Sequence, residues 1–245
     1  MNPALPSLLS SSAIPDSKSP VTRTRMHRSI YSGLTATVLR EHIVSGTLAA
    51  GVPLVEAALA DALGVSRGPV RNALIELEAE GLVRTGGNGR SVVAGFTQED
   101  LTDVLAVRLE IESLAARWGL QRKRDTAGIS NAFAEMLSEG SSTTRLADID
   151  LGFHRRLVEF SGSRSLLQSW LCLAPIIHAV ITVGNRRLGA RDGEADFQRI
   201  IESHRPIVKA VAAGDQRRCA KLLAAQFAIT AEMYCVDGGA GAGSR

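Results

Sequence analysis

One stretch, residues 66–84, constrains the fold of this chain more than any other. It reads SRGPVRNALIELEAEGLVR, and Ser66 can cap a helix by accepting a hydrogen bond from a backbone N–H of the first turn. Gly81 is placed to end that helix. Apolar residues recur at the spacing of a single helical face: Val70, Ala73, Leu74 and Leu77. A short helix with an apolar back is typical of the recognition helix of DNA-binding domains.

Two arginines give this helix its chemical character. Arg67 and Arg71 are four residues apart, so they lie along the same flank of the helix and can leave the core. In isolation the same spacing also describes an ordinary solvated helix face, which is what most helical arginines occupy. The segments on either side decide between these two interpretations.

The flanking segments predict a winged helix-turn-helix domain. Residues 34–43 show the pattern of an amphipathic helix, and residues 56–63 form a second helix closed by Gly64. After the recognition helix, residues 82–85 and 91–94 read as short strands joined by the glycine-rich segment 86–90. Two helices with a tight turn followed by a β-hairpin make the predicted domain of residues 30–95.

The rest of the chain predicts an all-α bundle. Helices are expected at 97–123, 126–138, 143–160, 165–183, 195–213 and 216–234, without an alternating strand pattern. The fold class is therefore mainly α, with a domain of residues 96–236 after the winged helix. Residues 1–29, rich in Ser and Pro, are expected to be a disordered arm, and residues 237–245 a flexible tail.

Charge and cysteine usage limit the functional classes. The chain has 28 Lys and Arg against 25 Asp and Glu, and residues 31–95 hold five basic and six acidic residues. DNA binding must therefore depend on placed arginines and on the basic N-terminal arm rather than on a uniformly basic domain. Three scattered cysteines without C-x-x-C spacing, and no apolar run near the ~20 residues of a membrane span, predict a cytoplasmic protein.

A second chemical signal lies in the bundle. Asp150 and His154 are at i and i+4, which places a carboxylate and an imidazole on one helix face, and His204 follows on a later helix. Such ligands suit Zn²⁺, Ni²⁺ or Mn²⁺. By spacing alone, histidines satisfied within the core are the commoner outcome.

In order and spacing, about sixty residues resemble the winged-helix signature of the GntR family of bacterial transcription regulators. The resemblance is carried by Leu59-Ala60, Leu63-Gly64-Val65-Ser66-Arg67, Pro69-Val70-Arg71, Ala73-Leu74, Leu77 and Glu80-Gly81-Leu82-Val83. It implies that the recognition helix and the wing contact DNA, and the expected set is Arg40, Ser66, Arg67, Val70, Arg71, Asn88, Gly89 and Arg90. Asn72 and Ala57 depart from residues usual in the family, so the contact set is expected to be smaller here.

The bundle resembles the effector domain of the FadR-type branch of that family, the FCD domain. Three segments carry this second resemblance: Arg108-x-x-Ile111-Glu112, Asp150-x-x-Phe153-His154 and His204-Arg205-x-Ile207. It implies a divalent metal held by Asp150, His154, His204 and a fourth ligand, usually histidine. That fourth position is Gln226, a poorer ligand, so metal binding is expected to be weaker, differently selective or absent. His178 is expected to line the bundle rather than to compensate.

The resemblance also implies a small organic acid as effector, such as a sugar acid or a hydroxy- or dicarboxylate. Arg108 can pair with its carboxylate by bidentate hydrogen bonding, or it can form a salt bridge with Glu112 at i+4; both interpretations stay open. The expected effector site is Arg108, Asp150, His154, His204 and Gln226.

The function that these expectations favour is a homodimeric transcriptional repressor that binds operator DNA and responds to this effector. The alternatives are a metal-responsive regulator and a metal-dependent hydrolase. The hydrolase interpretation lacks an evident nucleophile or general base and leaves the winged helix unexplained, so no enzymatic activity is expected.

Overall fold

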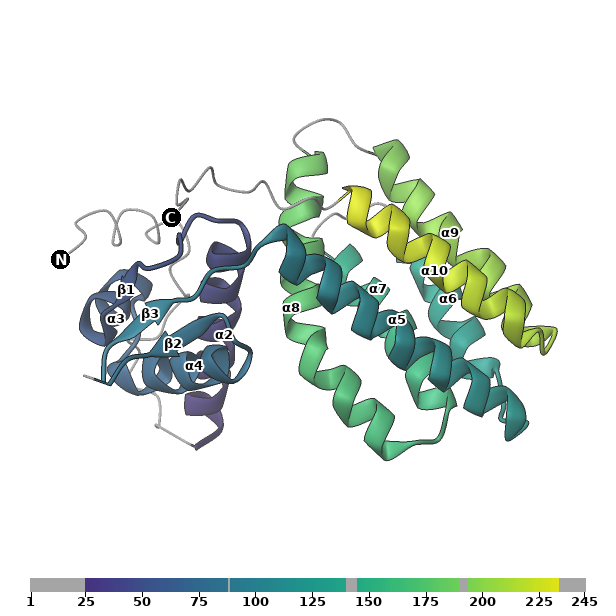
Figure 1. Ribbon diagram of the computed structural model, residues 1–245, viewed down its shortest axis with the longest axis horizontal. Coiled ribbons are helices and arrows are strands. Elements are labelled where there is room, and N and C mark those ends of the chain that lie inside the picture. Colours follow the sequence, from purple (N-terminus) through teal and green to yellow (C-terminus); the bar gives the residue numbers. More distant parts are fainter. Residues whose placement is uncertain (1–24, 88, 140–144, 190–193, 234–245) are drawn as a thin grey trace. The chain divides into compact units, whose positions relative to one another are not determined.

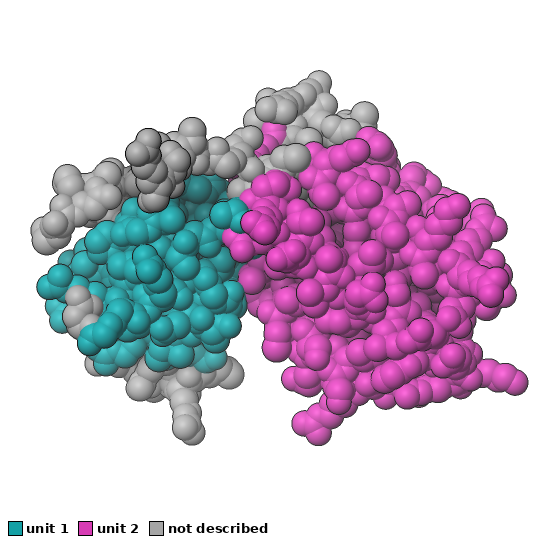
Figure 2. Space-filling model, in the orientation of Figure 1, with its two compact units in different colours: residues 1–97, 236–245 teal, residues 98–235 magenta. Residues whose placement is uncertain are grey.

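The computed structural model describes residues 25–87, 89–139, 145–189 and 194–233 (Figure 1). The chain divides into two compact units, shown in different colours in Figure 2. Unit 1 contains Met1–Thr97 together with Val236–Arg245, and unit 2 contains Gln98–Cys235. The predicted tail and most of the predicted arm lie outside the described residues.

Unit 1 is a small helical domain with a three-stranded sheet. Its strands follow the order β1-β3-β2, and both pairings are antiparallel. The hairpin of β2 and β3 is the predicted wing, and β1 adds a third strand to it. The elements are α2 (Arg25–Val44), β1 (Pro53–Leu54), α3 (Glu56–Leu63), α4 (Arg67–Ala79), β2 (Val83–Thr85) and β3 (Ser91–Val93).

The core of unit 1 holds α4 by its apolar back. Helix α4 packs against α2 and α3, and its Val70, Ala73 and Leu77 are all fully buried. Gly64 ends α3 with a φ of 68°, a left-handed conformation that glycine adopts without strain. This glycine makes the sharp turn between α3 and α4, so the predicted helix-turn-helix is present.

Three local expectations for unit 1 were wrong. Helix α2 begins at Arg25, so the last residues of the predicted disordered arm are helical. Ser66 stands at the N-cap of α4 in extended conformation, but its side chain makes no capping hydrogen bond there. Leu34, expected on the apolar face of α2, is 44% exposed, because Thr35, Ala36 and Leu39 occupy the buried face instead.

Unit 2 is an all-α bundle, as expected. Helix α7 packs against α5, α6 and α8, while α10 packs against α5 and α9 (Figure 1). Helix α8 continues six residues beyond its predicted end and contains Pro175. The helices are α5 (Gln98–Gln121), α6 (Ala127–Glu139), α7 (Leu146–Phe160), α8 (Arg164–Gly189), α9 (Glu194–Ala212) and α10 (Gln216–Met233).

A glycine allows α5 and α7 to approach closely. A Cβ atom at Gly119 of α5 would lie 2.2 Å from Cδ1 of Phe160 on α7, a separation that real side chains do not reach. Phe160 is 5% exposed and belongs to the main core cluster of the bundle. The absence of a side chain at residue 119 therefore sets the distance between the two helices that carry the site described below.

Helix α8 also bears on the expectation that no apolar segment could span a membrane. Among the described residues, Arg164–Arg187 is one helix that is long and apolar enough for this by length and composition. In the structure it packs against α5 and α7, and its Trp170 is 1% exposed within a core cluster. Of its most apolar window, 39% is buried inside the structure.

Candidate functional site

The exposed flank of α4 carries the two arginines singled out from the sequence. Arg67 and Arg71 are both exposed, and the guanidinium of Arg71 donates to both carboxylate oxygens of Glu56, each at 2.9 Å. These hydrogen bonds lower the pKa of Glu56. The side chain of Arg71 remains 66% exposed in this pair. Glu56 on α3 therefore orients an arginine at the surface of α4 without removing it from solvent.

Two residues of the expected DNA-contacting set are buried instead. Arg40 is 3% exposed and donates to Glu80 through Nε and Nη2, each at 2.6 Å, and to Glu76 at 2.9 Å. Its guanidinium joins α2 to the C-terminal part of α4. Val70 is fully buried because it lies on the apolar back of α4. Neither side chain is available to DNA, so neither belongs to the proposed set of DNA contacts.

The remaining expected DNA contacts lie at exposed positions or outside the described residues. Ser66 is exposed at the N-terminus of α4, and Gly89 and Arg90 are exposed at the hairpin tip. The N–H of Gly89 donates to the carbonyl of Gly86 at 2.8 Å, closing the tip into a tight turn. Asn88 lies outside the described residues.

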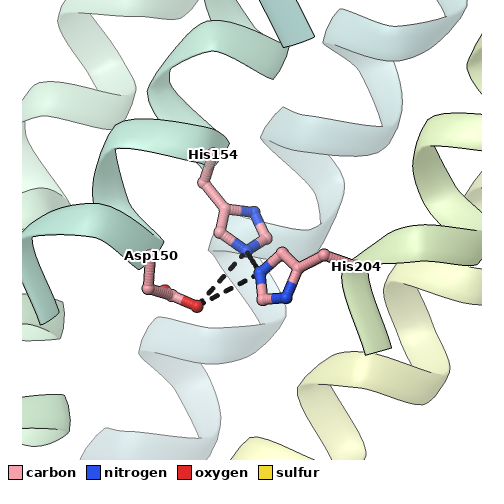
Figure 3. Close-up of side chains that lie close together, drawn as sticks. All are labelled: Asp150, His154 and His204. Atoms are coloured by element: carbon pink, nitrogen blue, oxygen red, sulfur yellow. Dashed lines mark hydrogen bonds and ion pairs between the residues drawn. The ribbon is translucent and has the colours of Figure 1, made fainter. Parts of the chain in front are cut away.

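In unit 2 the structure brings together the residues proposed as metal ligands (Figure 3). Asp150 and His154 project from α7 and His204 from α9, and their ligand atoms all lie within 4.8 Å of one another. Nε2 of His204 is 3.2 Å from Nε2 of His154 and 3.2 Å from Oδ1 of Asp150. All three residues are buried, with 6% exposure or less.

Hydrogen bonds made by the Nδ1 atoms determine the tautomers of His154 and His204. Nδ1 of His154 lies 2.5 Å from Oε2 of Glu112, and Nδ1 of His204 lies 2.8 Å from the backbone carbonyl of Ile200. Carboxylates and carbonyls only accept, so each Nδ1 carries a proton, and in the neutral ring each Nε2 keeps a lone pair. Two imidazole lone pairs and a carboxylate oxygen therefore converge on one point.

This donor set fits a divalent metal. Ligands about 2.1 Å from a metal are separated by roughly 3.0–3.4 Å in octahedral or tetrahedral geometry, which matches the two separations of 3.2 Å. The third separation, from Nε2 of His154 to Oδ1 of Asp150, is 3.9 Å. Asp150, His154 and His204 can supply three ligands after a small movement of the carboxylate.

The fourth expected position, Gln226 on α10, also reaches this point. Its Nε2 lies 2.6 Å from Nε2 of His204 and 3.3 Å from Nε2 of His154. Its Oε1 is buried and has no hydrogen-bond partner among the described residues. His178 lies elsewhere: its Nε2 is 3.0 Å from Asp148, on a partly exposed part of α8.

Arg108 was expected either to form a salt bridge with Glu112 or to pair with an effector carboxylate. Its Nε donates to Oε1 of Glu112 at 2.8 Å, so the i, i+4 salt bridge is present. Its Nη2 is 3.6 Å from Oδ2 of Asp150, and no described residue accepts a hydrogen bond from it. A 1% exposed guanidinium with one unused nitrogen retains the capacity to bind a further carboxylate.

The charges of this cluster shift its pKa values. Burial alone would raise the pKa of Asp150 and of Glu112, but their neighbours outweigh it, and both pKa values lie below their usual ranges: His154, His204 and Arg108 act on Asp150, and His154 and Arg108 act on Glu112. Burial, with help from Arg108, lowers the pKa of His154. One guanidinium therefore faces two carboxylates and two imidazoles in the core.

Sequence reasoning missed two members of the cluster. Glu112 was considered only as a partner of Arg108, yet it also orients His154 and accepts a hydrogen bond from Trp170 at 2.9 Å. The burial of Glu112 could have been anticipated, because it falls one turn after Arg108 on the helix face that also carries Leu101 and Leu105. No signal in the sequence places Trp170 beside it, since the two are 58 residues apart.

A winged helix with exposed arginines, followed by an all-α domain with a buried polar cluster, defines a DNA-binding regulator with a separate sensing domain. Comparison with protein families agrees: residues 35–93 match the bacterial regulatory proteins of the gntR family, and residues 103–228 match the FCD domain. The chain belongs to the GntR family of bacterial regulatory proteins, in the branch that carries an FCD domain.

Curated relatives resemble most of the chain. It is 28% identical over 198 residues to a Paenarthrobacter nicotinovorans protein described as "Probable D-xylose utilization operon transcriptional repressor", covering 79% of this chain and 84% of the relative. It is also 28% identical over 193 residues to the gluconate operon transcriptional repressor of Bacillus licheniformis, covering 77% and 79%.

Solved structures share the fold. A transcriptional regulator GntR from Rhodococcus sp. RHA1 aligns with a TM-score of 0.59 at 23% identity, over 82% of this chain and 96% of its own. Lar, which controls expression of the Listeria monocytogenes agr system, aligns with a TM-score of 0.63 at 18% identity, over 83% and 95%.

Proposed function

We propose that this protein is a cytoplasmic, homodimeric transcriptional repressor whose binding to operator DNA is controlled by a small carboxylate in the bundle. The observation that carries the proposal is the presence, in one chain, of two chemically distinct sites. One is the exposed flank of α4 with Arg67 and Arg71, and the other is the buried cluster around His154. Relatives described as operon repressors support repression rather than activation.

At the DNA, α4 of each protomer would enter the major groove at one half of a pseudo-palindromic site. Arg67 and Arg71 are the residues proposed to reach guanine edges, where a guanidinium can donate two hydrogen bonds. Glu56 positions Arg71 before binding, since the pair forms in the absence of DNA. Ser66 and the hairpin tip at Gly89 and Arg90 are proposed to contact the phosphate backbone and the adjacent groove.

In the bundle, Asp150, His154 and His204 are the residues that would hold a divalent metal, with Gln226 as a fourth neighbour. The bound ion would supply positive charge and an open coordination position for an anionic ligand. Glu112 keeps His154 in the tautomer that presents Nε2, and the carbonyl of Ile200 does the same for His204. Two carboxylates against one guanidinium favour a cation at this point.

The effector proposed for this site is a small organic acid. Nη2 of Arg108, buried and without a hydrogen-bond acceptor in the described chain, can donate to a carboxylate. A divalent ion would reverse the net charge of the cluster, so that one carboxylate would then balance it. Sugar acids come first among the compounds to test, because one similar protein is described as a gluconate operon repressor.

Selection from a randomised duplex pool tests the DNA-binding part of this proposal. The full chain should enrich a pseudo-palindromic sequence whose half-sites are about one helical turn, or a multiple of it, apart. The selected duplex then serves as the probe for a panel of carboxylates, each with and without Mn²⁺, Ni²⁺ or Zn²⁺. Enrichment of no sequence, with binding that depends on salt alone, would contradict the proposal.

A further inference from the structure

The amide nitrogen of Gln226 lies within 3.3 Å of the Nε2 atoms of both histidines proposed as metal ligands. This nitrogen forms a triangle with the two imidazole Nε2 atoms, with sides of 2.6, 3.2 and 3.3 Å. Both Nε2 atoms are acceptors, because their rings carry the proton on Nδ1. An amide NH₂ is the end of glutamine that can bond to them, whereas the carbonyl end would place three acceptors together.

The other end of the same amide is unsatisfied. Oε1 of Gln226 is buried in a residue that is 4% exposed, and it accepts no hydrogen bond from the described residues. A buried carbonyl without a donor is costly, so its orientation must be compensated by the bonds that the NH₂ end makes. Rotation of the amide by half a turn would exchange the two ends and aim Oε1 at the imidazoles.

We propose that Gln226 is a two-state residue: its NH₂ bridges His154 and His204 without metal, and its carbonyl oxygen turns inward to become a ligand when a divalent cation binds. In the first state the amide protons occupy the two lone pairs that a cation would otherwise use. In the second state those lone pairs bind the ion and Oε1 gains a partner. The side chain therefore keeps the cluster assembled without a metal and competes with metal for the same lone pairs.

This arrangement explains how α7, α9 and α10 can stay joined in the core without an ion. A histidine at residue 226 would bring one more imidazole acceptor and would depend on a proton or a metal to hold it there. Glutamine supplies its own protons. Weaker metal binding, and a folded bundle in the metal-free state, are two consequences of the same substitution.

The first test compares metal-free stability after chelation. Gln226→Leu should raise the unfolding equilibrium constant of the metal-free chain by roughly ten- to hundredfold, because it removes both hydrogen bonds and leaves two buried lone pairs. Gln168→Leu, at an exposed residue of α8, should change it by less than about threefold. Equal effects of the two substitutions would overturn the bridging role.

The second test uses zinc chloride alone as the probe. The side-chain NH₂ signals of Gln226, identified in ¹⁵N-labelled protein by their loss in Gln226→Leu, should shift when Zn²⁺ saturates the wild-type chain. Gln226→His should bind Zn²⁺ at least about tenfold more tightly by calorimetry, since imidazole replaces an amide oxygen. Zinc binding that leaves the NH₂ signals unshifted would overturn the proposed rotation of the Gln226 amide.

The inference rests on the metal role proposed above, and the two can fail separately. The comparison of metal-free variants tests whether Gln226 bridges His154 and His204, whether or not the bundle naturally binds a metal ion. The DNA selection reports on the regulator and does not involve Gln226.

Discussion

Neutralising Glu112 should destabilise the bundle far more than neutralising a surface carboxylate. Glu112 is fully buried and accepts hydrogen bonds from Arg108, His154 and Trp170. Glu112→Gln keeps the volume but removes the charge and turns an NH₂ group toward one of these donors. Breaking a buried ion pair by changing one partner costs about 3–5 kcal/mol, which for a chain of this size lowers Tm by roughly 6–20 °C.

Glu159→Gln is the matched control for this prediction. Glu159 lies on α7, is also ion-paired with two arginines, and has a side chain that is 26% exposed, so its loss should cost about 1 kcal/mol or less. Denaturant unfolding of both variants measures the difference. A double variant, Arg108→Met with Glu112→Leu, should recover part of the loss because both charges of this pair are removed, although Asp150 then loses its contact with Arg108. Equal costs for Glu112→Gln and Glu159→Gln would refute the reasoning.

Three further predictions follow from the described contacts. Arg71→Ala should weaken binding to the selected duplex by about 1–3 kcal/mol in an anisotropy titration and relax the sequence preference, while Arg155→Ala in unit 2 should do neither. Gly119→Ala should destabilise the bundle by about 1–3 kcal/mol, because its Cβ would meet Phe160. The control Gly152→Ala, where a Cβ meets open space, should stabilise the bundle by about 0.5–1 kcal/mol. A stabilising Gly119→Ala would contradict the close approach of α5 and α7. Since the folded-state pKa of His154 is lowered from 6.5, the unfolded chain binds more protons, and Tm should fall as pH drops below 6.5. The lowered pKa values of Asp150 and Glu112 should add a second fall below about pH 4.5, and a Tm that rises on acidification would contradict both.

Periodicity and glycine placement were sufficient to predict most of the fold. The helix-turn-helix follows from the spacing of Val70, Ala73 and Leu77 and from the left-handed turn at Gly64, which are local properties of the chain. The wing follows in the same way from two short apolar segments around a glycine-rich tip. Helix ends were less predictable: α8 runs to Gly189, six residues beyond the predicted end at residue 183.

The sites could be predicted less completely, because they depend on contacts between distant segments. The spacing of Asp150 and His154 indicates a shared helix face, but their meeting with His204 is a property of the bundle. Arg40 shows the converse: nothing local to α2 reveals that Glu76 of α4 and Glu80, the residue after α4, will bind its guanidinium and bury it. The orientation of the Gln226 amide likewise depends on which ring nitrogens are protonated, which only the neighbours determine.

Release of the selected duplex by a carboxylate is the measurement that bears most directly on the link between the bundle and DNA binding. Labelled duplex bound to the full chain is titrated with gluconate and the other carboxylates of the panel, with and without Mn²⁺, and the same titration is made with Arg108→Met. At least one carboxylate should release DNA from the wild-type chain, and Arg108→Met should retain DNA binding while losing that response. Release that is equally strong in Arg108→Met, or DNA binding that no carboxylate changes, would contradict control through this site.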